Sequence, residues 1–420
     1  MYASVLRMWV EERASRNKNP LAMTFDALRE YEQVRLDEDG ISTTTWNGNL
    51  PALRWFADTA VRLGLMQPMS DRDWKDLRRS GTSVRMPRVV DPDTYARFRR
   101  VGLQGLTPDG HLSHAFHALK TPIRDALFAD FLLIHGTRRA EACYLTLLDL
   151  PRRRAGYAFN VGYLPPAICK WGSGRDLEEQ VHWVQRLAAY HDSEWLTTIA
   201  EAQKSLRRAR DRGRLLVVTD VHDRFGRNTR LTIDGISSRR SLVNLTKEQR
   251  RRLVCTGQVA RRIGNESGMG RGMTQVQDAW VIPLAIFPGT RAPMLTPEAW
   301  GLTFREANDR VDALLRSGHA DVPDAERVTP HMLRHTFATQ WLAHELERIA
   351  ESDRDFAQVL ATGDAAQLRR RYFNPLLRVK ALLGHRSLET TLLYIDHIMR
   401  EQQAANMSGD SWIESFLEAN

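Results

Sequence analysis

Lysine and cysteine are both scarce in this sequence of 420 residues. Only seven of its 60 basic residues are lysines, so a reaction that needs a lysine has few positions to supply one. The cysteines Cys143, Cys169 and Cys255 are an odd number without a CxxC pair, which argues against a disulfide framework and against a structural zinc site. This cysteine usage fits a reducing compartment.

Long apolar runs are also missing. No run reaches the roughly 20 residues that a membrane helix needs. Acidic residues lie inside the first amphipathic stretch, which is not the pattern of a signal peptide. We therefore expect a soluble protein of the cytoplasm without a membrane partner.

Positive charge and apolar residues are what the chain has in quantity. It carries 60 Lys and Arg against 51 Asp and Glu, a formal net charge of +9, which favours a polyanionic partner and above all nucleic acid. The apolar fraction of 42% and the length are enough for two or three domains with cores of their own.

The first 86 residues are predicted to form several short helices. One of them has an apolar stripe at helical spacing. The periodicity lapses between residues 80 and 92, in a basic stretch that we interpret as a linker. Asp91-Pro92-Asp93 then predicts a new helix start. The members of the apolar stripe are Leu50, Leu53, Trp55, Phe56, Val61, Leu63 and Leu65.

Two helices are predicted between residues 122 and 148. The first is apolar and ends at His135 and Gly136, because Gly commonly ends a helix. Thr137 is expected to cap the second, which has Arg138 and Arg139 in its first turn. Arginines at this end of a helix are favourable when an anion lies between them and the free N–H groups. The alternative is a solvated arginine pair.

Short strands are predicted at residues 157–161 and 180–184, with a glycine-containing turn between them. Lys170 is therefore expected near the tip of a β-hairpin. Residues 204–214 and 239–252 are arginine-rich and are predicted to be helical with solvated faces, contact with phosphate being the second interpretation.

A further helix is predicted to begin at Pro330 with Thr329 as its cap. His331 and Arg334 are three residues apart and share a face of that helix. His331 and His335 have the spacing of a zinc-binding helix, but a methionine stands where the HExxH motif has its glutamate.

The last feature is a turn followed by a tyrosine. Gly384 is predicted to end a helix, His385 to lie in the turn, and Ser387 to cap the next helix. Tyr394 follows nine residues after His385, about two turns into that helix. A lone tyrosine on a helix is usually a core or surface residue, and one that follows a Gly-His turn at this distance is less ordinary.

These motifs occur in one order along the chain, and in that order they resemble the tyrosine recombinases, the integrase-type enzymes of DNA strand exchange. Thr137 stands where that family usually has leucine, and Ala140 where it has a small polar residue. The motifs are His135-Gly136-Thr137-Arg138-Arg139-Ala140-Glu141, then His331-x-x-Arg334-His335-Thr336, then Leu383-Gly384-His385 with Tyr394.

The resemblance implies a role for each residue of the motifs. Arg138 and Arg334 would clamp the phosphate, His331 and His385 would assist, and Tyr394 would be the nucleophile.

The resemblance also implies that Lys170 is the general acid. Lys204 and Lys247 are its only rivals between Lys170 and the second motif.

The resemblance also implies the architecture. The expected fold is mainly α with a small β-sheet (α+β). Residues 1–86 would be a helical core-site DNA-binding domain and residues 87–420 an integrase-like catalytic domain. The catalytic domain is expected to contain insertions near 198–300 and 346–371 and to end in a tail helix over 409–420.

The implied function is site-specific DNA recombination or integration for a transposon, a phage or a chromosomal system. Strands would be cut and rejoined through a 3′-phosphotyrosyl intermediate without metal, ATP or other cofactor. The implied partners are double-stranded DNA with paired half-sites and further copies of the chain, as dimers and tetramers, at the nucleoid. The alternatives are a DNA-binding protein that keeps the fold without the reaction, and a metal hydrolase that uses His331 and His335.

Overall fold

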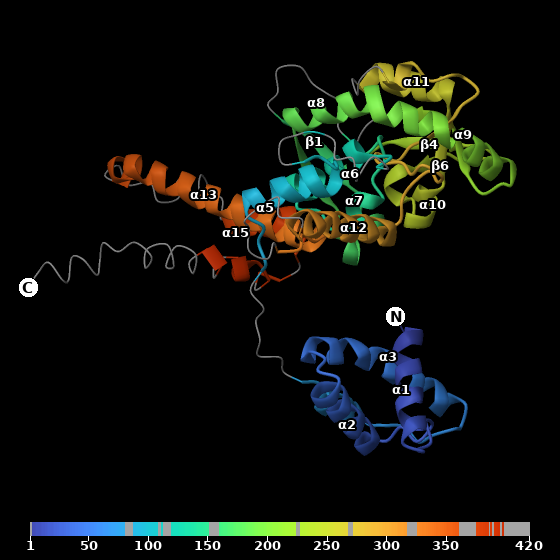
Figure 1. Ribbon diagram of the computed structural model, residues 1–420, viewed down its shortest axis with the longest axis vertical. Coiled ribbons are helices and arrows are strands. Elements are labelled where there is room, and N and C mark those ends of the chain that lie inside the picture. The colour runs from blue at the N-terminus through green and yellow to red at the C-terminus, as the bar shows by residue number, and fades with distance from the viewer. Residues whose placement is uncertain are drawn as a thin grey trace, which may run out of the picture. The chain divides into compact units, whose positions relative to one another are not determined.

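A computed structural model describes most of the chain, which divides into two compact units, Met1–Arg85 and Met86–Asn420 (Figure 1). The tail helix expected over 409–420, most of the linker and residues 361–371 of the second predicted insertion lie outside the described part. The described residues are 2–79, 87–107, 111, 119–150, 159–223, 227–267, 272–316, 326–360, 375–385, 387–388, 390–394 and 397–398.

The first unit is helical. Trp9, Tyr31 and Trp46 are fully buried at its centre, and the indole N–H of Trp46 donates to the carbonyl oxygen of Leu77 at 2.8 Å. Side-chain caps begin three of its helices: Thr24, Ser42 and Ser70 each accept from a backbone N–H in the first turn. The helices are α1 (Tyr2–Ser15), α2 (Phe25–Gln33), α3 (Thr43–Arg62) and α4 (Asp71–Asp76).

Only part of the apolar stripe that was predicted on α3 is buried. Leu50 and Leu53 are buried in the core, as expected. Trp55, Leu63 and Leu65 are exposed by 51%, 68% and 54%, so the prediction was wrong for them. Trp55 lies off the arc of α3 that contains Trp46, Leu50 and Leu53, and Leu63 and Leu65 come after the helix has ended at Arg62.

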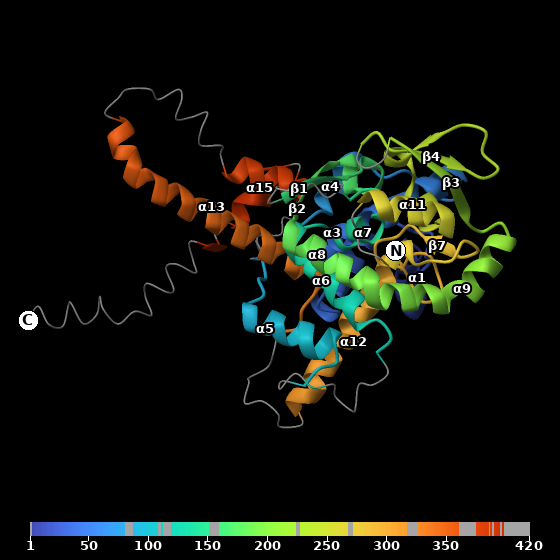
Figure 2. The same ribbon diagram turned by 90° about the horizontal axis from the view of Figure 1, so that it is seen from above.

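The second unit is built around α6, whose residues Leu127, Phe128, Phe131 and Leu132 are buried. Phe128 stacks on Trp300 of α12 with ring centroids 3.7 Å apart. α13 runs as one helix through the first part of the predicted 346–371 insertion, and its later half extends away from the other described elements (Figures 1 and 2). The helices are α5 (Pro92–Arg97), α6 (Pro122–His135), α7 (Arg139–Cys143), α8 (Val181–Tyr190), α9 (Leu196–Asp211), α10 (Lys247–Arg251), α11 (Gly257–Ser267), α12 (Pro297–Arg316), α13 (Pro330–Leu360) and α15 (Pro375–Leu383).

Two small sheets complete the second unit. A two-stranded antiparallel hairpin pairs β1 with β2, and a five-stranded sheet has the order β5-β4-β3-β6-β7, with β3 and β6 parallel. The expectation of a mainly α fold with a small β-sheet is confirmed. The strands are β1 (Phe159–Leu164), β2 (Arg175–Gln180), β3 (Leu216–His222), β4 (Arg230–Ile233), β5 (Arg240–Ser241), β6 (Leu253–Thr256) and β7 (Val281–Pro283).

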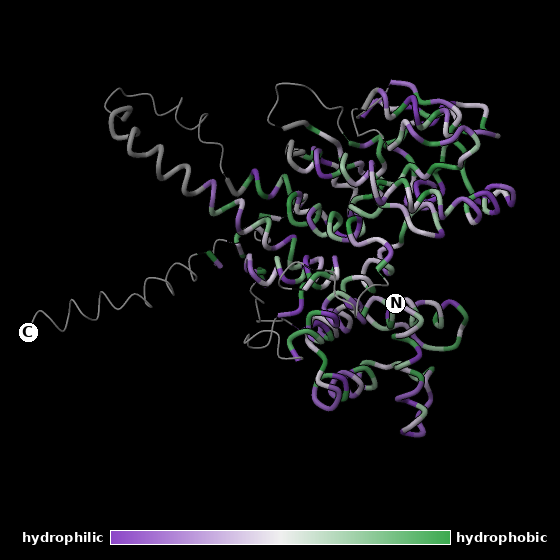
Figure 3. Tube along the Cα trace, turned by 45° about the horizontal axis from the view of Figure 1, so that its top comes forward, coloured by the Kyte–Doolittle hydropathy of each residue, from purple (hydrophilic) through white to green (hydrophobic). Residues whose placement is uncertain are grey.

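The five-stranded sheet lies in the stretch near 198–300 that was expected to be an insertion. The first arginine-rich segment is α9, whose outer end is hydrophilic (Figure 3). Within the second segment, only Lys247–Arg251 is α-helical, and Arg250 is 1% exposed and ion-paired to Asp149 at 2.7 Å. The prediction of a solvated helical face at 239–252 was therefore wrong, because Arg250 is a core residue that finds a buried carboxylate.

In the part of the chain that the structure describes, no helix is both long enough and apolar enough to cross a membrane.

Candidate active site

The turn after α6 is the first wall of the site. Gly136 has a left-handed φ of +57°, and its N–H bonds the Leu132 carbonyl oxygen at 3.0 Å, which ends the helix as predicted. A Cβ at Gly136 would lie 2.2 Å from the Phe337 ring of α13. Only glycine permits this turn to lie against α13.

Arg138 follows the turn and is the N-cap residue of α7. The prediction that Thr137 caps this helix was wrong, as was its extension to 148, because α7 ends at Cys143. Glu141 takes the place of a conventional cap: its carboxylate accepts from the Arg138 backbone N–H at 2.9 Å and from Arg138 Nη1 at 2.8 Å. The side chain of Arg138 keeps 26% of its surface exposed.

Glu141 also accepts from Arg175 Nη2 at 2.8 Å, and both side chains are buried. Burial alone raises the pKa of the Glu141 carboxyl, but Arg175 and Arg138 outweigh it and lower the pKa to about 2. Arg175 Nε and Nη1 have no hydrogen-bond partner among the described residues. Sequence reasoning assigned no role to either residue, although Glu141 stood in the first motif and Arg175 five residues after Lys170.

The β1–β2 hairpin carries Lys170 in the loop between its strands, as expected. The predicted strand at 180–184 was wrong, because β2 ends at Gln180 and α8 begins at Val181. Lys170 is exposed, and its Nζ lies 5.5 Å from the ring centroid of Trp171. The same loop reaches the Gly384 turn, since a Cβ at Gly384 would lie 3.1 Å from Ser173 Oγ and 3.0 Å from Arg175 Nη1.

The rival lysines differ in their surroundings. Lys204 lies exposed on α9 beside Arg207 and Arg208. Lys247 lies with its Nζ 5.9 Å from the ring centroid of Tyr144. Burial raises the pKa of the Cys169 thiol to about 11, and among the charges that oppose this rise are Arg175, Arg138 and Lys247. Lys247 is therefore near the pocket, a relationship that sequence did not reveal.

The helix α13 supplies His331 and Arg334. It begins at Pro330, and the Thr329 hydroxyl accepts from the Met332 N–H at 3.3 Å, as the cap prediction required. Arg334 is 2% exposed, and it donates through Nη1 to the Gly136 carbonyl oxygen at 2.5 Å and through Nη2 to the Leu383 carbonyl oxygen at 2.6 Å. Burial, with Arg138 and Arg175, lowers its pKa to about 9, so the guanidinium is still charged at neutral pH.

The turn after α15 supplies His385. Gly384 has a left-handed φ of +63° and ends the helix as predicted. His385 Nδ1 lies 3.1 Å from Thr391 Oγ1, and its ring stacks on Tyr394 with centroids 6.1 Å apart and an interplanar angle of 6°. Burial, followed by the charges of Arg334 and Arg138, lowers the pKa of His385 to about 3. The imidazole is therefore neutral at pH 7.

Tyr394 lies in the helical stretch 390–394 and is 2% exposed. Burial raises the pKa of its phenol, while Arg334 and Arg138 act in the opposite direction. It belongs to a small apolar cluster, separate from the main core, with Ala338, Leu342, Val379, Leu383 and Ile398.

The hydroxyl of Tyr394 lies 2.9 Å from Nδ1 of His335, a residue that sequence considered only as half of a zinc pair. The His331 and His335 rings meet edge to face with centroids 4.4 Å apart. Within the described ranges, no group of three or more His, Cys, Asp or Glu side chains is placed to hold a metal ion.

The structure thus brings five of the six predicted residues into electrostatic range of one another. Arg138 and Arg334 both influence the pKa values of His331, His385 and Tyr394. Lys170 is not among the groups that shift these values, and its hairpin loop reaches the Gly384 turn beside His385. A phosphate that entered here would meet two guanidinium groups, neutral imidazoles and a phenol.

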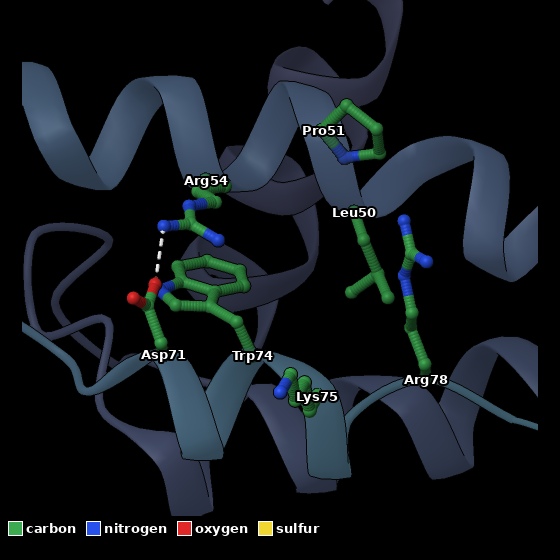
Figure 4. A pocket seen from close by; sticks show the side chains of 7 residues that line it. All are labelled: Leu50, Pro51, Arg54, Asp71, Trp74, Lys75 and Arg78. Carbon is green, nitrogen blue, oxygen red and sulfur yellow. Dashed lines mark hydrogen bonds and ion pairs between the residues drawn. The ribbon is translucent and has the colours of Figure 1, made fainter.

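The first unit offers a hollow of its own between α3 and α4. Arg54 lies 5.9 Å from the ring centroid of Trp74 and is ion-paired to Asp71 at 2.6 Å (Figure 4). Lys75 and Arg78 are exposed on its wall. Trp74 itself is buried, and it is the exposed cations of this wall that suit the phosphate backbone of a nucleic acid.

No protein-family model and no curated protein matches the sequence. Solved structures do match over most of its length. XerA recombinase has 15% identity and a TM-score of 0.34, over 96% of this chain and 90% of that chain. The Tn1549 transposon integrase in complex with a circular intermediate DNA has 14% identity and a TM-score of 0.39, over 93% and 94%. A lambda integrase dimer bound to a core site has 13% identity and a TM-score of 0.38, over 94% and 86%.

The matched structures are named as recombinases and integrases.

Proposed function

We propose that this protein is a site-specific DNA recombinase that cuts and rejoins strands through a 3′-phosphotyrosyl intermediate on Tyr394. The observation that carries the proposal is that Arg138, Arg334 and His385, from distant parts of the chain, surround the Tyr394 phenol, with His331 beside the same two arginines. A binding protein needs arginines near phosphate, but it does not need a phenol held among them.

The arginines fit the charge of the reaction. Attack on a phosphodiester spreads negative charge over the nonbridging oxygens, so fixed guanidinium donors bind the transition state more tightly than the ground state. Arg334 is held rigidly by two main-chain carbonyls, and Arg138 by Glu141. Donors that are already oriented need little reorganisation when the charge develops.

The reaction conserves its atoms and its bonds. The Tyr394 phenol gives its proton to a neighbouring base and its oxygen forms a bond to phosphorus, while the bond from phosphorus to the 5′ oxygen breaks and the leaving oxygen takes a proton from Lys170. The 5′ hydroxyl of a partner strand then reverses the step and releases the tyrosine. Because one ester replaces another, no ATP, metal or other cofactor is required.

We assign DNA binding to both units. The helical unit (residues 1–86) would contact the core site, with the hollow that holds Lys75 and Arg78 lying on the phosphate backbone. The catalytic unit (residues 87–420) would hold the scissile phosphate. Paired half-sites would recruit dimers and then a tetramer at the nucleoid, with residues 409–420 as the segment exchanged between neighbours.

The test compares how much wild-type protein and how much Tyr394→Phe protein is trapped covalently on a nicked suicide substrate. The duplex is first selected from random sequence by binding to the Tyr394→Phe protein, so no site needs to be known beforehand. Wild type is expected to form a protein–DNA adduct resistant to denaturant, and Tyr394→Phe to bind equally well and form none. Tyr190→Phe is the matched control, because Tyr190 is fully buried in the same unit and its hydroxyl has no hydrogen-bond partner among the described residues.

An adduct of undiminished yield with Tyr394→Phe would remove Tyr394 as nucleophile. Specific binding by wild type without any adduct would favour the alternative, a DNA-binding protein with this fold and no reaction. Cleavage lost on chelation would instead favour the metal hydrolase.

A further inference from the structure

The phenol oxygen of Tyr394 has one hydrogen-bond partner among the described residues, His335 Nδ1 at 2.9 Å. The two ring centroids are 5.7 Å apart. His335 follows directly after Arg334 on α13, so the helix that fixes the guanidinium also fixes this imidazole. Tyr394 belongs to a buried apolar cluster, and His335 is half-buried beside it.

The surroundings of His335 keep its imidazole neutral. Burial lowers its pKa to about 4, and the nearby His331, Arg334 and His397 act in the same direction. At neutral pH the ring therefore has one nitrogen without a proton, and a phenol can donate to it. The other groups that face it are His331 on its own helix and Tyr394 opposite.

The other two histidines are engaged differently. His385 Nδ1 lies 3.1 Å from Thr391 Oγ1, and the ring stacks parallel to Tyr394, so its nitrogens are not the ones that meet the phenol oxygen. His331 meets the ring of His335 edge to face. Of the three, His335 is the one in hydrogen-bond contact with the attacking atom.

We propose, on the basis of the recombinase function above, that His335 is the general base for Tyr394. As the phenol oxygen bonds to phosphorus, its proton moves to Nδ1 of His335, which becomes an imidazolium. The 5′ oxygen leaves with a proton from the acid on the opposite side. In the rejoining step the imidazolium returns its proton to the departing phenolate, so each half-reaction restores what the other used.

The decisive experiment compares His335→Asn with wild type in single-turnover adduct formation on the selected duplex. Asparagine keeps a hydrogen-bond acceptor near the position of Nδ1 but cannot take up a proton. The expected rate is about 10²- to 10³-fold below wild type, the usual contribution of general acid–base catalysis. His344→Asn is the matched control, because His344 is exposed on the same helix.

Two readouts separate a base from a merely structural residue. With a 5′-phosphorothiolate at the scissile position the leaving group needs no acid, so a Lys170→Ala protein should recover its rate and His335→Asn should not. The His335→Asn rate should also rise with pH up to about 8, where Arg334 is still charged, because more phenolate forms without help, while the wild-type rate levels off.

Recovery of His335→Asn on the phosphorothiolate would reassign His335 to the acid and overturn the proposal, as would a rate equal to wild type. Binding of the duplex and the urea midpoint establish that the variant is folded. Should it not fold, the pH dependence of wild type on the phosphorothiolate decides: a rise without a plateau would exclude a histidine base. Wild type without any adduct refutes the recombinase function itself, and that result is distinct from each of these.

Discussion

Arg334 donates through Nη1 to the carbonyl oxygen of Gly136 at 2.5 Å, across 198 positions of sequence. Its Nη2 binds the carbonyl oxygen of Leu383 just before the turn that holds His385. The guanidinium therefore links the two glycine turns through its hydrogen bonds, and it also supplies a positive charge to the site. These two roles can be separated by experiment.

Arg334→Lys keeps the charge and cannot span both carbonyls, because an ammonium is a point donor without a planar fork. We expect the rate of adduct formation to fall about 10²- to 10³-fold. The free energy of unfolding should fall by about 1–3 kcal/mol, the cost of an unpaired buried carbonyl. Urea denaturation and single-turnover trapping measure the two effects. Arg207→Lys is the control, because Arg207 is exposed on α9. An unchanged urea midpoint in Arg334→Lys would contradict the structural role of Arg334.

Glu141→Gln removes the carboxylate that Arg138 and Arg175 share. We expect the free energy of unfolding to fall by about 3 kcal/mol, because two arginines lose a buried countercharge. The Glu141 pKa is lowered from 4.5 to about 2, so its stabilisation is complete above pH 4.5 and is lost as pH falls through 2. The difference in the free energy of unfolding between wild type and the variant should accordingly be constant from pH 5 to 8. A difference that grew with pH in this range would point to another group.

Lys170→Ala and Lys247→Ala decide which lysine protonates the leaving oxygen. We expect Lys170→Ala to lower adduct formation about 10²- to 10⁴-fold and Lys247→Ala to have a small effect. Lys204→Ala, outside the pocket on α9, should match wild type. The reverse order between Lys170 and Lys247 would transfer the role to Lys247, whose charge also acts on the Cys169 thiol.

The neutral histidines predict an acid-sensitive pocket. The pKa values of His335 and His385 are lowered from 6.5 to about 4 and about 3. Below pH 6.5 the unfolded chain binds protons at these positions before the folded protein does, so the free energy of unfolding should decrease between pH 6.5 and 5. Urea titrations of wild type and of the double variant His335→Asn, His385→Asn measure this slope. A slope as steep in the double variant would show that the acid sensitivity lies elsewhere.

The turns around the site could be predicted because their chemistry is local. Gly136 and Gly384 end helices as expected, and Thr329 caps α13 as expected. Each depends on one or two residues whose backbone preference is decided within a helical turn. The motifs that carry the resemblance lie at these turns.

The strands could not be located in this way. β2 is a polar stretch, Arg175–Gln180, with little intrinsic preference for a strand, and it exists because β1 pairs with it. In the five-stranded sheet β5 has two residues and β7 three, too short for any periodicity. The buried ion pair of Arg250 could not be predicted either. The segment 239–252 is arginine-rich, and the partner of Arg250, Asp149, is 101 positions away in the sequence.

His335 was missed as a functional residue because one sequence pattern has two interpretations. Its spacing from His331 fits a metal helix, and nothing local shows that the ring meets a tyrosine 59 positions later. The signal that could have found it is the repetition of histidine directly after Arg334, on a helix already assigned to the phosphate.

The burial of Tyr394 has a consequence for the DNA specificity of the proposed enzyme. A phenol that is 2% exposed cannot reach the phosphodiesters of the many duplexes that a basic protein touches in passing. Under the proposed function, attack would wait for a rearrangement that a matched site stabilises and a chance encounter does not. The small apolar cluster around Tyr394 would then protect unmatched DNA from cleavage.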